Sequence, residues 1–311
     1  MLNNLYKILK ILVTTFILIF LFQKIGISSA IDKLYLCDFK FILIASLLVL
    51  FAIFTNSLRS YKISRTLKIN ISYFQSIKFI FIGQFFNQIL PSSVGGDSIR
   101  IWLTHKNKKN NSLSKSTSSI LCDRASGLLI SCFLPFFSII FFYKSVGHGL
   151  NYFFNTALFF SSIVIVTYLF LFFYTSRVSK FFKKISFLNL IFKDLRFVLF
   201  FSKDKILIFI LSVIMQLLGC FTYVLIARSI NVTLSIYDAF IVIPLISIIS
   251  TIPLSLAGWG VREGAAIFIM KYCAISNGDA LTISIIFGIL QIFSSIPGLI
   301  LFTFKKNSSH E

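Results

Sequence analysis

The sequence predicts an all-α polytopic membrane protein, with residues 1–311 forming a single membrane domain. The first observation is composition: 57% of the residues are hydrophobic and only 13% are charged, whereas soluble domains carry about 25% charged residues. The second is length, because several apolar runs approach or exceed the roughly 20 residues that a helix needs to cross a bilayer. The third is the placement of basic loops. Together they predict six crossing helices and two re-entrant helical hairpins, arranged as an inverted repeat.

The formal net charge is +20. In a soluble protein this excess would indicate nucleic-acid binding, but in a polytopic membrane protein it is typical of basic loops on the cytoplasmic side. We therefore expect no nucleic-acid partner. We expect membrane lipids as partners, with a lipid- or glycan-modifying enzyme as a further candidate.

The apolar runs set the order of the elements. They cover residues 8–23, 39–57, 74–90, 117–143, 152–174, 206–228, 236–256, 261–273 and 280–303. Lys7 precedes the first run, Lys10 lies near its start, and Ser28-Ser29-Ala30 follow it, as in a cleaved signal peptide. We expect it to be retained as a crossing helix, because the polar Gln23 and Lys24 directly follow its apolar part.

The run 74–90 lies between two strongly basic loops, one from Arg59 to Lys68 and one from Arg100 to Lys115. A full crossing would put these loops on opposite sides of the membrane, against the positive-inside rule. If residues 74–104 instead enter and return, both loops become cytoplasmic. The sequence therefore predicts a first re-entrant hairpin here.

A second hairpin over residues 236–273, entering from outside, places both chain termini in the cytoplasm. The two halves, about 1–145 and 152–304, then have the same order of elements in opposite orientation, as in many secondary transporters. Residues 187–201 are too charged and too short to cross, so we expect a helix lying in the cytoplasmic interface. These features predict a multi-pass protein of the bacterial cytoplasmic membrane.

Each predicted hairpin contains a break in its apolar sequence. The first reads IGQFFNQILPSSVGGDSIRIW over residues 82–102, and the second reads PLSLAGWGVRE over 253–263. Proline cannot continue a helix and glycine frees the backbone, so both segments predict interrupted helices that line a cavity. The residues that form the breaks are Pro91, Gly95, Gly96, Pro253, Gly258 and Gly260.

Charges close to the breaks are candidates for substrate binding, since a charge at the bilayer centre costs about 2.5–3.5 kcal/mol. Helices that restart near Asp97 and Val261 present unpaired N–H groups, and with Arg100 and Arg262 they would suit a phosphate or carboxylate. In the alternative, Asp97 caps its helix, and Arg100 and Arg124 are interfacial anchors. The candidates are Asp97, Arg100, Asp123, Arg124, Arg262 and Glu263.

Uncharged polar residues near the breaks are expected to line the same cavity: Gln84, Asn87, Gln88, Ser92, Ser93 and Ser255. The three amides would alternatively bond to neighbouring helices. The sequence has no Cys or His pattern with metal-ligand spacing, so we expect no metal and no cofactor.

Three segments carry a family resemblance: GQFFNQILPSSVGGDSIR at 83–100, DRASG at 123–127 and IPLSLAGWGVRE at 252–263. They resemble the flippase-like transmembrane domain of the lysylphosphatidylglycerol synthase family, and the breaks and charged candidates match its motif positions. The resemblance implies crossing helices, re-entrant segments and lipid translocation. Bifunctional members carry a C-terminal aminoacyl-transferase domain, whereas this sequence ends soon after its last apolar run, so we do not expect transferase activity.

The leading functional hypothesis is a flippase or transporter for an anionic, zwitterionic or aminoacylated phospholipid or a lipid-linked sugar. A second hypothesis is a membrane enzyme, or enzyme subunit, that acts on a lipid phosphate with Asp97, Asp123 or Glu263 as an acid or base. A third is a non-catalytic partner of such an enzyme. The sequence favours transport, because it contains no Gly-rich phosphate loop and no recognisable nucleophile–base pair.

Overall fold

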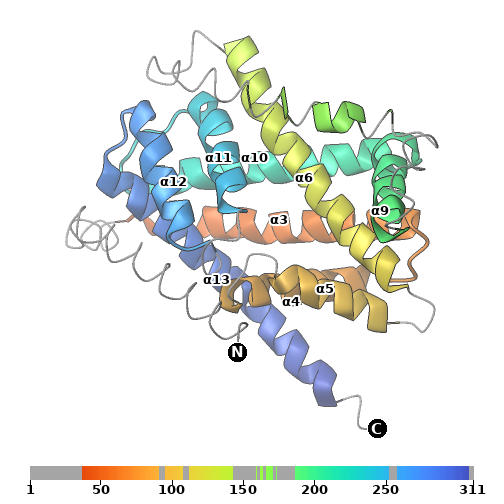
Figure 1. Cartoon of the computed structure of the whole chain (residues 1–311). Coiled ribbons are helices and arrows are strands. Elements are labelled where there is room, and N and C mark those ends of the chain that lie inside the picture. Colours follow the sequence, from red (N-terminus) through yellow and green to blue (C-terminus); the bar gives the residue numbers. More distant parts are fainter. Residues whose placement is uncertain are drawn as a thin grey trace, which may run out of the picture.

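A computed structural model describes residues 37–90, 95–107, 112–142, 186–251 and 258–307, with isolated helical residues between 159 and 173. This part of the chain is helical and contains no strand (Figure 1). Its α-helices are α3 (Phe39–Thr66), α4 (Tyr73–Ile89), α5 (Gly95–Lys106), α6 (Leu113–Phe142), α9 (Ser186–Arg196), α10 (Lys205–Ser229), α11 (Ile236–Ser250), α12 (Val261–Met270) and α13 (Asn277–Asn307). A π-helical turn, Phe197–Phe201, follows α9, and a 3₁₀ turn, Lys271–Cys273, follows α12.

Among the described residues, four helices are long and apolar enough to cross a membrane, at Phe39–Thr66, Leu113–Ser138, Lys205–Ser229 and Asn277–Thr303. On α3, Leu43, Leu47, Phe51 and Phe54 recur every three or four residues and are 43–56% exposed. An apolar helical stripe that faces outward is typical of contact with lipid. Of the two further predicted crossings, 8–23 lies outside the described residues, and 152–174 includes only isolated ones.

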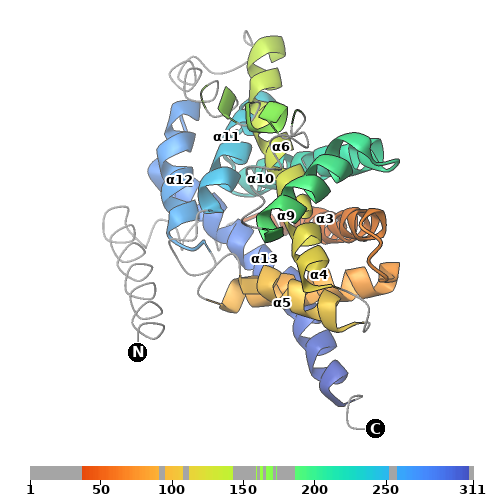
Figure 2. The same cartoon turned by 45° about the vertical axis from the view of Figure 1, so that its right-hand side comes forward.

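The two segments predicted as hairpins each contain a pair of contacting helices. The end of α5 lies beside the start of α4, because Asn107 Nδ2 donates to Gln75 Oε1 at 3.1 Å and to the Asn70 carbonyl at 3.4 Å. Helices α4 and α5 lie side by side in both views (Figures 1 and 2). Helices α11 and α12 also contact each other. The connecting residues 91–94 and 252–257 lie outside the described part of the chain.

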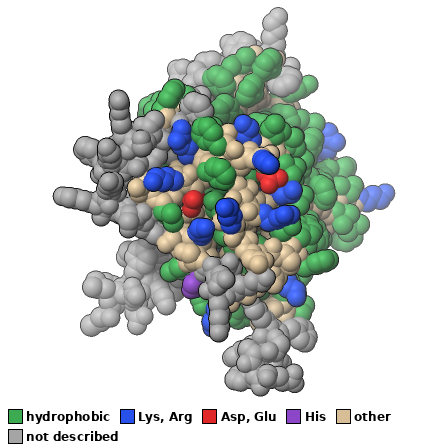
Figure 3. Space-filling model, turned by 90° about the vertical axis from the view of Figure 1, so that its right-hand side faces the viewer, with side chains coloured by type: hydrophobic (Ala, Val, Ile, Leu, Met, Phe, Trp, Pro, Cys, Tyr) green, Lys and Arg blue, Asp and Glu red, His purple; other side chains and the backbone are tan. Residues whose placement is uncertain are grey.

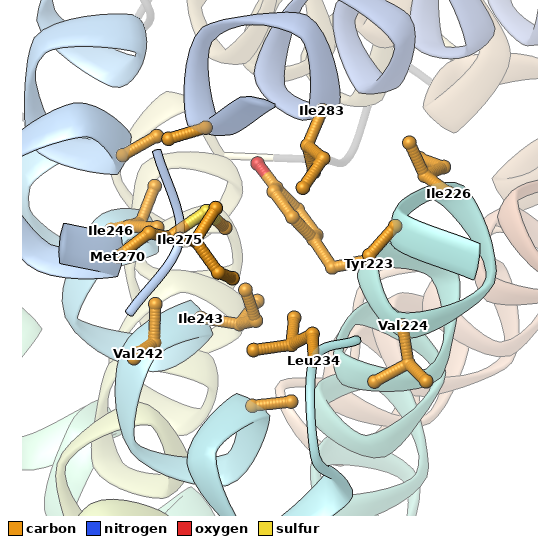
Figure 4. Close-up of a cluster of buried hydrophobic side chains, with 14 of the residues drawn as sticks. Tyr223, Val224, Ile226, Leu234, Val242, Ile243, Ile246, Met270, Ile275 and Ile283 are labelled. Carbon is orange, nitrogen blue, oxygen red and sulfur yellow. The ribbon is translucent and has the colours of Figure 1, made fainter. Parts of the chain in front are cut away.

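The largest apolar cluster holds α11 and α12 against α10 and α13. Tyr223 of α10, Ile243 and Ile246 of α11, Met270 of α12 and Ile283 of α13 all belong to it (Figure 4). A second cluster joins α3, α4, α5, α6, α9 and α10. The order of a long helix, a helix pair and a second long helix therefore occurs twice, in α3–α6 and in α10–α13.

Lysine and arginine side chains gather on one face of the molecule (Figure 3). This face contains the end of α3 and the start of α10 (Figure 1), which a 3.4 Å ion pair between Lys62 and Asp204 connects. The contact of Asn107 with Asn70 brings the end of α5 to the connection between α3 and α4. The described residues that enter α4 and leave α5 thus lie at the same end of this helix pair.

Close packing of α4 and α5 requires glycine at two facing positions. A Cβ on Gly96 would clash with the carbonyl oxygen of Gly83 and lie 2.6 Å from Asn87 Oδ1. A Cβ on Gly83 would lie 2.6 Å from Cγ and Cδ of Arg100. Because the obstacle at Gly96 is backbone, a methyl group there has to separate the two helices.

We expect Gly96→Ala to lower the free energy of unfolding by about 1–3 kcal/mol, the usual effect of overpacking. Gly264→Ala is the matched control, because a Cβ on that helical glycine meets no atom within 4 Å. The control should be neutral or slightly stabilising. Thermal unfolding of the detergent-solubilised variants measures the difference, and equal melting temperatures would show that this contact tolerates a methyl group.

Candidate functional site

Five charged side chains from α3, α5 and α6 form one continuous ion-pair network inside the helix bundle. Asp123 is central: its Oδ1 accepts from Arg59 Nε and its Oδ2 from Arg100 Nη2, each at 2.9 Å. Asp97 Oδ1 accepts from Arg100 Nη1 at 3.2 Å, and its Oδ2 accepts from Arg124 Nε at 2.6 Å. Only the Arg124 side chain, which is 40% exposed, is not fully buried.

The local sequence explains part of this geometry. Asp97 and Arg100 are three residues apart on α5 and therefore share a face. Asp97 lies in the first turn of α5, where a negative charge is favourable. Both of its oxygens accept from arginines, and Arg100 is buried. These contacts contradict the alternative in which Asp97 is a helix cap and Arg100 an interfacial anchor.

Arg59 is a member of the network that sequence reasoning missed. The sequence predicts a cytoplasmic loop at Arg59 because the apolar run ends at residue 57, but α3 continues to Thr66 and Arg59 is 4% exposed. Its Nη1 donates to Ser212 Oγ at 3.0 Å, and its Nη2 to Asn56 Oδ1 at 3.4 Å. The three-residue spacing of Asn56 and Arg59, which puts both on one helical face, was the signal available in the sequence.

A second polar cluster surrounds the start of α12. Glu263 Oε1 accepts from Arg262 Nη2 at 2.7 Å and from Ser284 Oγ at 3.1 Å. The Arg262 guanidinium also lies over the rings of Trp259 and Phe287, at 4.9 and 5.7 Å from their centroids. Glu263 is fully buried and Arg262 nearly so, which makes the expected pairing of these two neighbours essential for their charge balance.

At each of the two breaks, one backbone N–H at the helix start donates to a protein side chain. At α12, Gly258 and Gly260 have φ values of 82° and 84°, a region that favours glycine. The Gly260 N–H donates to Glu263 Oε2 at 2.6 Å, and the Gly96 N–H of α5 donates to Asn87 Oδ1 at 2.9 Å. The expectation that both starts offer their N–H groups to an anion is therefore wrong for these two donors.

A cavity with charged, amide and apolar lining residues lies between the two clusters. It has three adjoining chambers of about 220, 350 and 560 Å³, which share as lining residues Gln84, Arg124, Ser247 and Gln291. Arg262 and Arg124 both line the 220 Å³ chamber, whereas Arg100 lines the 560 Å³ chamber together with Asp97 and Asp123. Arg124, and not Arg100 as expected, is thus the arginine that shares a chamber with Arg262.

The expected amides do line this cavity. Gln84, Asn87 and Gln88 all border the 220 Å³ chamber. Asn87 also bonds to α5, as in the alternative, while Gln88 Oε1 is buried with no partner among the described residues. The structure adds Gln216 and Gln291, which the sequence analysis did not select. Pro91, Ser92, Ser93, Pro253 and Ser255 lie outside the described residues.

Metal-ligating side chains do not converge in the part of the chain that the structure describes. No group of three or more His, Cys, Asp or Glu residues is found there. The arginines dominate this site instead, and guanidinium groups are suited to binding phosphate or carboxylate oxygens. The arrangement can therefore bind an anionic group in a cavity that also offers several amides.

Comparison with known proteins agrees with a membrane protein of this kind. The family model described as "Lysylphosphatidylglycerol synthase TM region" matches residues 7–298. The UPF0104 membrane protein PH1989 of Pyrococcus horikoshii is 28% identical over 119 residues, which cover 38% of this chain and 36% of the relative. No solved structure matches. Because the family model covers nearly the whole chain, this integral membrane protein belongs to the lysylphosphatidylglycerol synthase TM region family.

Proposed function

We propose that this protein is a lipid flippase or transporter of the bacterial cytoplasmic membrane, which accepts the head group of an anionic lipid or lipid-linked sugar. The observation that carries the proposal is the pair of guanidinium groups in one chamber: Arg124 from the first half of the chain and Arg262 from the second. Two arginines that converge on one polar cavity inside a membrane helix bundle are suited to bind a phosphate.

The rim of the cavity is consistent with a lipid substrate. Leu121 and Leu128 of α6 line the 560 Å³ chamber and are 39% and 38% exposed. These leucines provide an apolar edge for acyl chains, while Arg124 and Gln84 line the same chamber. A head group can therefore enter the chamber while its hydrocarbon chain stays in the bilayer.

The contacts of the three carboxylates favour binding and transport over acid–base catalysis. Both oxygens of Asp97 and both oxygens of Asp123 accept from arginine side chains. Glu263 uses one oxygen for Arg262 and Ser284 and the other for the Gly260 N–H. Each carboxylate is thereby committed to holding a protein group, which suits a positioning role.

Vesicle reconstitution tests the transport proposal directly. Liposomes with a labelled phosphatidylglycerol should exchange it between leaflets faster with the protein than without it. Arg124→Gln should slow the exchange on the order of tenfold, because it removes one charge-assisted hydrogen-bond donor. Lys203→Gln, the same change at an exposed residue, should leave the rate unchanged. No acceleration of any anionic phospholipid or lipid-linked sugar would overturn the proposal, and a chemically altered lipid would point to an enzyme.

The proposed orientation, with both termini and the basic face in the cytoplasm, has its own test. Cysteines introduced at Asn111 and Asn189 should react with an impermeant maleimide only from the cytoplasmic side, and a cysteine at Gly149 only from outside. The native cysteines must first be replaced by serine or alanine so that labelling reports these sites. Opposite sidedness of positions 111 and 189 would rule out the first re-entrant hairpin and, with it, the inverted repeat.

A further inference from the structure

We infer that the cavity selects a phosphodiester lipid of net charge −1 whose head group is a neutral polyol, such as glycerol or a hexose, and discriminates against amine-bearing head groups. This inference deepens the proposed function and rests on it for the location of the binding site. Two independent properties of the cavity lead to it: its net charge and the chemistry of its uncharged lining.

The charge of the cavity is one unit positive. Four arginines and three carboxylates form the two clusters, so one positive charge is left over: Arg59, Arg100, Arg124 and Arg262 against Asp97, Asp123 and Glu263. Six of these side chains line the chambers directly, and Glu263 is bound to Arg262. Excess charge in a membrane interior is costly, and one monoanionic ligand would neutralise it.

The other acidic residues in the described part of the chain do not supply the missing negative charge. The chain has ten Asp and Glu residues. Outside the two clusters, the carboxylates of Asp38, Asp238 and Asp279 each accept a hydrogen bond at a helix start. Asp204 pairs with Lys62, and Asp194 lies on α9. None of these five lines a chamber of the cavity. The other two, Asp32 and Glu311, lie outside the described residues.

The uncharged lining is rich in amides. Five carboxamide side chains from α4, α10 and α13 border the chambers: Gln84, Asn87, Gln88, Gln216 and Gln291. An amide offers two donors and an acceptor, so a set of amides matches hydroxyl groups, which donate and accept as well. The chambers of about 350 and 560 Å³ are within the range of about 300–1,000 Å³ for small-molecule sites.

Other head groups fit this lining less well. An ammonium group only donates, and its positive charge adds to the excess positive charge of the cavity, so it needs a carboxylate beside it. All six oxygens of the three cluster carboxylates already accept bonds from the protein. A phosphomonoester or a diphosphate brings more than one negative charge against a single excess positive charge. A monoanionic phosphodiester with hydroxyl groups satisfies both the charge and the amides.

Direct binding in detergent separates this inference from transport. Native mass spectrometry with the whole protein should compare phosphatidylglycerol with three lipids of the same acyl chains: phosphatidylserine, phosphatidylethanolamine and phosphatidic acid. Phosphatidylserine has the same net charge but carries an amine, so it isolates the effect of the polyol. We expect phosphatidylglycerol to bind at least about tenfold more tightly than each of the three, the effect of about one charge-assisted hydrogen bond. Measuring a polyprenyl phosphohexose in the same assay shows whether the glycerol or the hexose head group binds more tightly.

Gln84→Glu tests the charge argument without changing side-chain shape. Gln84 lines all three chambers, and a glutamate there cancels the excess positive charge. The preference for phosphatidylglycerol over phosphatidylethanolamine should then be lost, whereas the surface variant Lys203→Gln should keep it. Equal binding of phosphatidylserine and phosphatidylglycerol, or an unchanged preference in Gln84→Glu, would overturn the inference.

Equal movement of all four lipids in vesicles would overturn the inference about head-group selection but not the transport proposal. Selective binding without movement would overturn the transport proposal alone.

Discussion

Asp123→Asn is expected to lower the free energy of unfolding by about 3–5 kcal/mol, the usual cost of removing one partner from a buried ion pair. The Asp123 carboxylate connects the guanidinium groups of Arg59 and Arg100 at 2.9 Å each. All three side chains are at most 7% exposed. An asparagine keeps the shape but leaves two buried positive charges close together, with only Asp97 to compensate Arg100.

Thermal unfolding in detergent measures this loss, and Asp279→Asn is the matched control. The Asp279 carboxylate accepts one hydrogen bond, from the Ser276 hydroxyl at the start of α13. The free energy of unfolding of its amide variant should therefore lie within about 0.5 kcal/mol of that of the parent protein. The double variant Arg59→Gln with Asp123→Asn removes one positive and one negative charge, and it should be more stable than Asp123→Asn alone. If Asp123→Asn and Asp279→Asn have the same melting temperature, the network does not hold α3, α5 and α6 in place.

Arg262→Gln is expected to be similarly destabilising and also to abolish lipid movement. The change leaves the fully buried Glu263 without its cationic partner. Adding Glu263→Gln removes that unpaired charge, and glutamine retains an oxygen that can accept from the Gly260 N–H at the start of α12. The double variant should therefore regain most of the expression level and melting temperature.

Lipid movement distinguishes a structural role of Arg262 from a binding role. If Arg262 binds the head group, the double variant should fold but move lipid on the order of tenfold or more slowly than the parent protein. Arg262→Lys should give an intermediate rate, since it keeps the charge but loses the planar, bidentate donor geometry. Full recovery of lipid movement in the double variant would assign Arg262 to a structural ion pair only.

Features encoded within one helix or one short segment were predictable from the sequence. The apolar runs at 39–57, 117–143, 206–228 and 280–303 correspond to the four long apolar helices, because hydrophobic length is a local property. The start of α12 at Val261 and the pairing of Arg262 with Glu263 follow from neighbouring residues in the second break. The membrane class and the two interrupted segments therefore required no tertiary information.

Contacts between helices depend on how each helix is rotated and packed, which the sequence alone left open. Arg59 and Asp123 are 64 residues apart, and only the packing of α3 against α6 brings them together. The same packing buries Arg100 between two carboxylates and leaves Arg124 to line a chamber with Arg262. Gln216 of α10 and Gln291 of α13 line the same chamber as Gln84 of α4, which brings together residues far apart in the sequence. The sequence thus determined which residues are charged or polar inside the membrane, and the tertiary structure decided which of them meet.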